Sequence, residues 1–242
     1  MLFSLPLFAA GVLWDPTAES LNVLYQAPNY VTAPSASWAP TVGTVPLTQT
    51  AAPPPAAVGG APDCEVSTDF PLGATLDPNT VWAVDPAHTF FAVIILESIS
   101  RNGANPWQND GLIADSANYC GLFLRDNLGA LSAIMYEWDT AARSATVDIT
   151  SLLTGDAGFL VVQGKKEGGI LYIRAANATT TTGWVAGNAC GNLSSAAANI
   201  RAGSGGGTAD GVLKCIGSAP TAWSDETAAR FEAWARRVHS TI

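Results

Sequence analysis

Apolar and polar residues alternate or cluster in short runs along most of this chain, a pattern typical of β-strands. The clearest example is residues 157–176, where two β-rich runs, Phe159–Gln163 and Ile170–Arg174, flank a glycine-bounded turn at Gly164–Gly169. β-Branched and aromatic residues favour a pleated surface, and glycines supply the positive φ angles of a tight reversal. We therefore predict a β-hairpin here, with the charged residues 165–167 in its solvated turn.

The same pattern predicts further strands. The run Thr89–Glu97 is nearly continuous in apolar residues, which suits a central strand covered on both faces. The other predicted strands are Gly11–Trp14, Thr80–Val84, Gly111–Ala114, Tyr119–Arg125, Ala130–Trp138, Ser144–Ile149, Asn199–Gly203 and Gly211–Ile216. Many short strands with glycine-rich connections indicate an antiparallel sandwich.

One helix is predicted, over Asp225–His239 at the end of the sequence. Ser224 is a natural N-cap, and the acidic residues of the first turn and the arginines of the last complement the helix dipole. An apolar stripe with helical spacing is expected to dock on the sandwich; it consists of Phe231, Trp234, Ala235 and Val238.

Residues 27–62 differ from the rest because they are dominated by Pro, Ala, Thr, Ser and Gly. Proline fixes φ and removes a hydrogen-bond donor, so regular strands are poorly supported. We predict an extended arm or a long loop within a single domain of residues 1–242. A disordered linker is the alternative, but Tyr30 and Trp38 favour docking onto a surface.

Charged residues are few and unevenly distributed along the chain, which limits the kinds of partner that it is expected to bind. Only 13% of the 242 residues are charged, the net charge is −9, and residues 1–100 contain eight acidic residues but no Lys or Arg. No basic surface is available there to follow phosphates, so we expect neither nucleic-acid binding nor attachment to an anionic membrane. The apolar residues 1–11 also lack the basic start of a secretory signal, and we expect them to be retained.

Four cysteines are too few for a disulfide scaffold, and their spacing is unlike that of zinc knuckles. They are Cys64, Cys120, Cys190 and Cys215. We favour buried, reduced thiols that act as small apolar residues. A disulfide between Cys190 and Cys215 is the first alternative.

Known catalytic motifs are absent from the sequence, with one near miss. Jelly-roll glucanases place acids at E-x-D-x-x-E along a strand, so that two carboxylates flank the scissile bond. Glu137 and Asp139 match the first two positions, but Ala142 stands at the third. We therefore expect no enzyme activity and interpret the two acids as residues at a strand end.

A candidate ligand site lies in the segment around residue 107. Trp107, Asn109 and Asp110, with Asp115 and Asn118 nearby, combine an aromatic ring with oxygen ligands suited to carbohydrate or calcium. The alternative is a set of polar loop residues that cap strand ends. No other cofactor is expected.

The order of these signals resembles a known family. Gly111–Leu124, Ala133–Trp138, the hairpin ending at Leu171–Arg174 and Ser224 before a closing helix are similar to concanavalin A-like, laminin-G-like jelly rolls, in the version found in tailed-phage and prophage structural proteins. The resemblance implies an all-β, two-sheet antiparallel jelly-roll sandwich with an extended N-terminal arm and one C-terminal helix. It also implies a location on a virion.

On this basis we expect a non-catalytic virion structural protein that decorates a capsid, forms a head spike or sits on a tail. Its partners would be a major capsid or tail protein and further copies of itself. The apolar start would anchor it, through Leu2, Phe3, Leu5, Leu7 and Phe8. The alternative is a lectin-like module that binds a host glycan.

Overall fold

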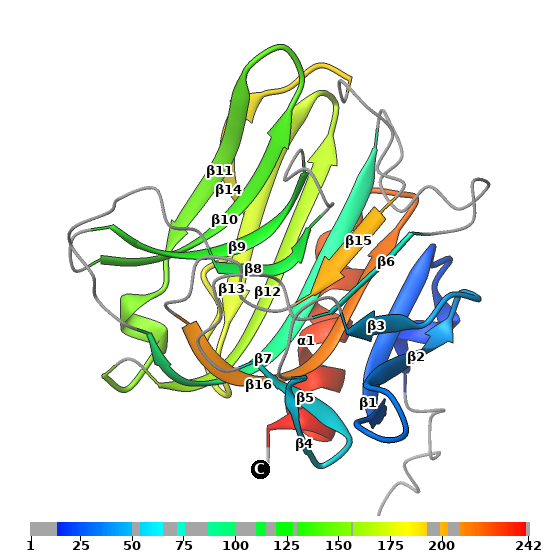
Figure 1. Cartoon of the computed structure of the whole chain (residues 1–242). Coiled ribbons are helices and arrows are strands. Elements are labelled where there is room, and N and C mark those ends of the chain that lie inside the picture. Colours follow the sequence, from blue (N-terminus) through cyan, green and yellow to red (C-terminus); the bar gives the residue numbers. More distant parts are fainter. Residues whose placement is uncertain are drawn as a thin grey trace, which may run out of the picture.

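The computed structural model describes residues 14–49, 54–64, 72–75, 87–99, 110–114, 120–127, 130–155, 157–192, 199–202 and 209–240. Strands dominate it (Figure 1). The first ten strands are β1 (Val23–Val31), β2 (Ser37–Val42), β3 (Leu47–Gln49), β4 (Ala56–Val58), β5 (Ala61–Cys64), β6 (Leu72–Thr75), β7 (His88–Ile99), β8 (Asp110–Ala114), β9 (Cys120–Asn127) and β10 (Ala130–Trp138). The remaining elements are β11 (Ala142–Asp148), β12 (Gly158–Glu167), β13 (Ile170–Ala176), β14 (Val185–Ala189), β15 (Asn199–Ala202), β16 (Ala209–Ala219), helix α1 (Asp225–His239) and the 3-10 turns η1 (Pro16–Ala18) and η2 (Thr150–Leu152).

Fourteen of the strands form one antiparallel hydrogen-bonded path that folds over into two facing sheets, and β4 and β5 form a hairpin off this path, where β5 pairs with β16. The front sheet has the order β11-β10-β9-β8-β15-β6-β3, and the back sheet has the order β1-β16-β7-β12-β13-β14 (Figure 1). Strand β2 joins them because it pairs with both β3 and β1. The predicted two-sheet antiparallel sandwich is confirmed.

Strand β7 lies inside the back sheet and is buried on both faces, as its continuous apolar sequence predicts. Phe90, Ala92 and Ile94 point between the sheets, where side chains from both layers form the main core. Phe91 and Val93 point the other way, toward the C-terminal helix. Alternate residues of a strand face opposite sides, so this one strand supplies two cores.

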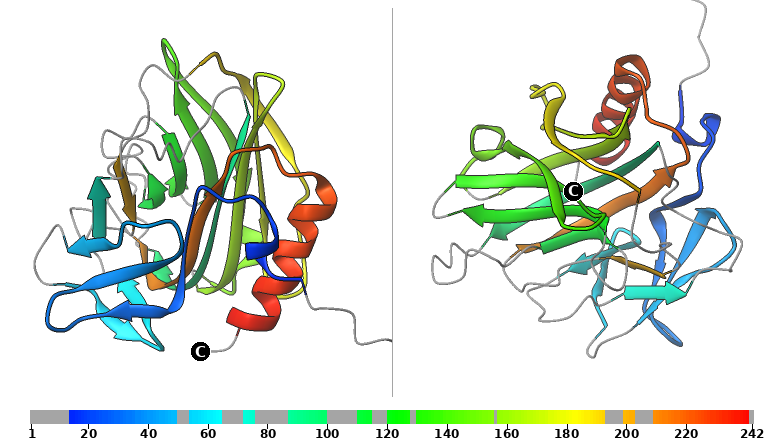
Figure 2. Two further views of the ribbon diagram at one scale, coloured as in Figure 1. Left: turned by 90° about the vertical axis from the view of Figure 1, so that its right-hand side faces the viewer. Right: turned by 90° about the horizontal axis from the view of Figure 1, so that it is seen from above.

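Helix α1 covers the outer face of the back sheet (Figure 2). Its predicted bounds and N-cap are confirmed, since Ser224 Oγ accepts the N–H of Thr227 at 3.1 Å. The predicted stripe is partly wrong: Val238 is exposed, whereas Glu232 and His239 are buried. Glu232 lies on the buried side because Arg174 Nε of β13 donates to its Oε1 at 2.7 Å.

The proline-rich stretch is more regular than predicted. Residues 27–62 contain the end of β1, all of β2, β3 and β4, and the start of β5, so the expectation that strands are absent is wrong. These strands are short or irregular, and the β1–β2 ladder shifts register next to Pro40, which is how a sheet tolerates missing donors. The predicted docking is confirmed by Tyr30 and Trp38, both buried in the main core.

The hairpin at 157–176 is confirmed, but its turn is shorter than predicted. Strand β12 continues to Glu167, and Gly168 and Gly169, with φ angles of 59° and 75°, make a two-residue reversal. Lys165 and Lys166 therefore belong to the strand and are buried, so their predicted exposure is wrong. They point to opposite faces: Lys165 Nζ donates to the Trp223 carbonyl at 3.0 Å, whereas Lys166 enters the space between the sheets.

The thiols of Cys120, Cys190 and Cys215 are free and buried. The Cys190–Cys215 disulfide alternative is therefore wrong, because Cys190 lies in the core between the sheets and Cys215 packs under the helix. Burial raises the pKa of the Cys215 thiol well above its ordinary value. Three of the four cysteines thus behave as the small buried residues expected from the sequence.

Candidate functional site

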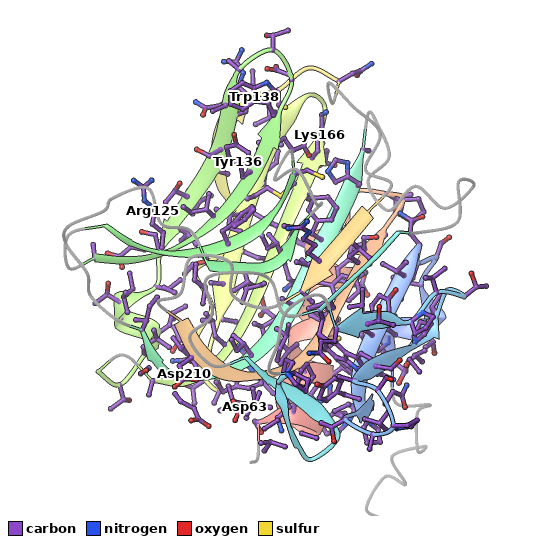
Figure 3. All side chains as sticks on the ribbon, in the orientation of Figure 1. Asp63, Arg125, Tyr136, Trp138, Lys166 and Asp210 are labelled. Atoms are coloured by element: carbon purple, nitrogen blue, oxygen red, sulfur yellow. The ribbon has the colours of Figure 1, made fainter. Side chains whose placement is uncertain are left out.

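The strongest candidate site among the described residues is the outer face of the front sheet, along β10 (Figure 3). Strand β10 pairs with β9 and β11 in unbroken register, so its even-numbered residues share one face. We call the four apolar side chains on this surface the aromatic face; they are Phe123 of β9 and Ile134, Tyr136 and Trp138 of β10. Phe123 and Tyr136 meet edge to face at 6.1 Å, with 88° between their planes.

Exposure increases along the aromatic face toward the end of the strand. Phe123 and Ile134 are buried, Tyr136 is partly buried, and Trp138 is 39% exposed. Among the described residues, the other exposed large apolar side chains are Val31 and Val238. Trp138 is therefore the exposed aromatic of the described surface, and a single exposed ring of this size is suited to contact with a ligand.

Small side chains flank the aromatic rings. Tyr136 lies opposite Gly121 of β9 and Ser144 of β11, and Trp138 lies opposite Ala142. Glycine is required at position 121 in any case, because its φ is 153° and a Cβ would meet the backbone of Ile113 and Ala114. Among the described residues, the side chains directly opposite Tyr136 and Trp138 in the ladders are therefore small, and the bulky contact of Tyr136 is the diagonal one with Phe123.

Polar groups border the same face on β11. Thr146 and Asp148 are exposed and lie opposite Ile134 and Ser132 in the ladder. The Thr150 N–H donates to Asp148 Oδ1 at 2.8 Å, and this bond lowers the pKa of the Asp148 carboxyl below its ordinary value. Ser144, opposite Tyr136, and Thr146, one pair further along, thus place hydroxyl groups nearest the exposed rings, whereas Asp148 lies toward the other end of the strand pair.

The inner face of the same strand carries a different group. Glu137, between Tyr136 and Trp138, points into the sandwich and meets residues from three other segments; we call the four residues the buried cluster: His88, Glu137, Lys166 and Cys190. Glu137 Oε1 lies 2.5 Å from His88 Nε2, and Oε2 lies 3.2 Å from Lys166 Nζ. The Cys190 thiol also donates to Oε2, at 3.4 Å.

The buried cluster is closed off from solvent. His88 and Glu137 are fully buried, and Lys166 is 1% exposed. Burial and the nearby negative charge of Glu137 raise the pKa of the Cys190 thiol to about 12, which keeps it protonated. Lys166 Nζ also donates to the Gly191 carbonyl, so its ammonium is held on two sides.

Hydrogen bonds to Asp139 join the turn after β10 to the segment after β14. Its Oδ2 accepts the Gly191 N–H at 2.9 Å, and its Oδ1 accepts the Ala141 N–H at 2.9 Å and the Arg143 Nε–H at 3.2 Å. The backbone bonds, with that from Gly191 the largest, hold the pKa of this carboxyl well below its ordinary range. Asp139 is thus a structural acceptor that fixes the end of the aromatic face.

The arrangement of these acids does not form a glycosidase centre. The Glu137 carboxylate lies inside the sandwich and the Asp139 carboxylate is bonded to its own turn, so the two do not face a common groove. The expectation that they are strand-end residues describes Asp139 well. Glu137 is instead a buried partner of two basic residues, a role that the sequence does not indicate.

The residues predicted for ligand binding and anchoring fall largely outside the described part of the chain. Trp107 and Asn109 lie outside it, and Asp110 begins β8 with only its backbone described. The anchoring residues Leu2, Phe3, Leu5, Leu7 and Phe8 also lie outside it. Tyr136 and Trp138 were missed, although their alternate positions in the predicted strand 130–138 are a usable signal.

Among the described residues, no group of three or more His, Cys, Asp or Glu side chains is placed to hold a metal ion. None of their helices has the length and apolarity needed to cross a membrane. The side chains of the predicted calcium ligands Asp110, Asp115 and Asn118 lie outside the described part of the chain, and this site stays a prediction.

Comparison with known proteins identifies the fold only. No family model and no curated protein sequence matches the chain. Solved structures similar to it include the botulinum neurotoxin serotype G binding domain (TM-score 0.59, 8% identity, 90% of this chain and 52% of that one) and the serotype D/C VPI 5993 binding domain (0.59, 11%, 89% and 52%). The receptor-binding domain of the C/D mosaic serotype has a TM-score of 0.56 and 12% identity, over 89% of this chain and 51% of that one. The chain spans about half the length of these structures, with which it shares a β-sandwich.

Proposed function

We propose that this chain is a non-catalytic, lectin-like binding domain and that the aromatic face is its contact surface for glycan. The observation that carries the proposal is Trp138, an exposed ring at the end of a rigid strand with small neighbours on the adjacent strand. Sheet positions hold a ring more firmly than loops do, and an aromatic ring presents a flat apolar surface with little conformational entropy to lose.

The chemistry of the surrounding residues supports a sugar as ligand. A pyranose offers an apolar face of C–H groups and an edge of hydroxyls, which matches aromatic rings bordered on β11 by the hydroxyl side chains of Ser144 and Thr146. Acidic residues outnumber basic ones across the chain, 20 to 11, which disfavours strongly anionic ligands such as nucleic acid. A neutral or weakly charged oligosaccharide therefore fits best.

The fold comparisons support a binding role rather than a catalytic one. The similar structures are binding domains of neurotoxins, and one is described as a receptor-binding domain. Similarity of fold alone is weak evidence for a shared function, so the proposal depends on the residues of the aromatic face.

A glycan array with the wild-type protein and a Trp138→Ala variant tests this proposal. We expect a set of wild-type signals that Trp138→Ala weakens at least about tenfold, as loss of a stacked ring requires. Val238→Ala, an exposed position on α1, is the matched control and should bind as the wild type does. Retention of full binding by Trp138→Ala would overturn the site.

A second variant, Trp107→Ala, distinguishes the loop site predicted from the sequence from the aromatic face. If Trp107→Ala abolishes binding and Trp138→Ala does not, the glycan site lies at Trp107, Asn109 and Asp110. Repeating the array with a calcium chelator tests the calcium ligands of that segment. No sugar-dependent signal for the wild type would remove the lectin proposal altogether.

We also propose a place of action: the virion of a tailed phage or phage-like particle, where the domain would be displayed as a capsid decoration, head spike or tail-associated protein. The supporting observations are the order of sequence signals quoted above and the apolar, base-free N-terminal region. Its partners would be a major capsid or tail protein and further copies of itself.

Removal of residues 1–13 tests the proposed anchoring through Leu2, Phe3, Leu5, Leu7 and Phe8. A longer deletion, to residue 26, would also remove Val23–Gln26, which pair with β16, and would damage the fold. The shorter deletion leaves β1 intact, and we expect it to abolish association with particles while the thermal melting of the free protein is unchanged. Full occupancy of particles by the truncated protein would overturn the anchor.

A further inference from the structure

The buried cluster holds a nucleophile and a carboxyl group in contact where water is excluded. Lys166 comes from β12 of the back sheet and Glu137 from β10 of the front sheet, and their side chains meet between the layers. Lys166 is labelled in Figure 3. Desolvation of two opposite charges is costly, and an apolar pair of similar volume often serves stability as well. Stability alone therefore does not account for this buried pair, and its geometry indicates a chemical role.

We propose that Lys166 and Glu137 are joined by an intramolecular amide bond that links the two sheets. Lys166 Nζ lies 3.2 Å from Glu137 Oε2, whose carbon Cδ is the electrophile. Both groups are on strands, so their approach is fixed before reaction, which is the arrangement that gives high effective concentrations. The inference concerns a modification site and is independent of the proposed glycan binding.

The reaction is a condensation and needs no oxidant or cofactor. In a medium of low dielectric, the neutral amine and carboxylic acid lie closer in energy to the ion pair than they do in water, so one proton moves from Lys166 to Glu137. The amine lone pair then attacks Cδ, the Cδ–OH bond breaks, and the nitrogen loses its second proton. The products are the secondary amide and one water.

The neighbouring side chains supply what this step requires. His88 Nε2, 2.5 Å from Glu137 Oε1, is placed to pass a proton to the departing hydroxyl. The His88 ring packs 4.7 Å from the Phe90 ring, in apolar surroundings. The Gly191 carbonyl accepts from Lys166 Nζ and orients the amine. Exclusion of bulk water then protects the amide from hydrolysis.

Cys190 is the competing nucleophile, because its thiol also contacts Glu137 Oε2, at 3.4 Å. Attack by sulfur would give a thioester with the same loss of water. Its thiol pKa of about 12 keeps it protonated, and a protonated thiol is a poor nucleophile. Lysine is therefore the expected partner, and the two products are chemically distinguishable.

Mass spectrometry of the purified, denatured full chain tests the proposal. We expect the wild type to be lighter than its sequence by one water, and trypsin to release fragment 126–143 joined to fragment 166–174, because cleavage after a linked Lys166 is blocked. Lys166→Met should have the full sequence mass. Glu137→Gln should form the same amide with loss of ammonia, and His88→Ala should form it more slowly.

Lys165→Met is the matched control, since Lys165 neighbours Lys166 but points to the opposite face, and it should keep the loss of water. A wild-type mass equal to the sequence would overturn the proposal whatever the variants do. A loss of water that hydroxylamine reverses, with one thiol blocked, would assign the bond to Cys190 and overturn the role of Lys166.

Discussion

The two faces of strand β10 carry side chains of opposite kinds at its final residues. On the inner face, Glu137 is buried and contacts two basic residues and a thiol. On the outer face, Tyr136 and Trp138 become progressively exposed and have small neighbours on the adjacent strands. One strand thus places its charge where water is absent and its largest apolar ring where water is present, the reverse of ordinary burial preferences.

This reversal separates stability from recognition. The inner charge is compensated by contacts, so its removal should change the free energy of unfolding strongly and ligand binding only indirectly. The outer ring buries little in the free protein, so its removal should change binding strongly and stability little. Substitutions on the two faces therefore test that separation.

Lys166→Met has the largest expected effect, because it leaves the Glu137 carboxylate buried with neither an ammonium partner nor an amide bond to the facing sheet. We expect the free energy of unfolding to fall by about 3–5 kcal/mol, measured by denaturant titration. The double variant Lys166→Met/Glu137→Leu removes both charges and should recover part of that loss. Both variants lack Lys166, so this comparison is independent of the proposed amide. A double variant less stable than the single one would contradict the argument.

Glu232→Ala tests the second buried charge, beneath helix α1. Glu232 accepts from Arg174 Nε at 2.7 Å and from Gln163 Nε2 at 3.2 Å. The substitution should lower stability by about 3 kcal/mol, because Arg174 is then left buried against Trp184, whose ring centroid is 5.4 Å from its Cζ. Glu226→Ala, an exposed partner of Arg230 on the same helix, is the matched control and should change stability by less than about 0.5 kcal/mol.

The sequence predicts best where structure is set by neighbours along the chain. Helix α1 was predicted residue for residue because its cap and terminal charges lie within fifteen residues. The hairpin strands follow from local β propensity. The turn was predicted too long because Lys165 and Lys166 become buried only through Trp223 and Glu137, which are distant in the sequence.

The candidate site was harder to predict, for the same reason. The buried cluster unites residues 88, 137, 166 and 190, and no spacing along the chain indicates that they meet. The glucanase-like pattern drew attention to Glu137, which was interpreted as a residue at a strand end, whereas its side chain lies inside the sandwich. The place of Trp138 on the same face as Tyr136 could have been predicted, because alternate residues of the predicted strand 130–138 share a face.

Acid should destabilise the protein through His239, the last residue of α1. Burial, with a smaller contribution from Lys214, lowers its pKa from 6.5 to about 4. The unfolded chain therefore binds a proton at this histidine near pH 6.5, whereas the folded chain binds it only near pH 4. The free energy of unfolding falls as the pH drops through this window. At pH 5 this group alone accounts for about 2 kcal/mol relative to pH 8.

His239→Leu tests this titration because it keeps an apolar contact beside Trp234 and has no proton to bind. Unfolding curves between pH 8 and pH 4.5 should show a shallower decline for the variant than for the wild type. Parallel declines would show that other groups carry the acid sensitivity.

Trp138→Ala has the smallest expected effect on stability and completes the comparison of the two faces. The ring is 39% exposed and lies at the strand end, opposite Ala142, so its loss leaves no enclosed cavity. We expect the free energy of unfolding to change by less than about 1 kcal/mol, although glycan binding falls. Gly164→Ala is the contrasting substitution between the sheets, where a new Cβ would lie 2.7 Å from Leu122 Cδ2 and should cost about 1–3 kcal/mol by overpacking. If Trp138→Ala destabilises the chain as much as Gly164→Ala does, the outer ring is a structural element and the two faces of β10 do not divide stability from recognition.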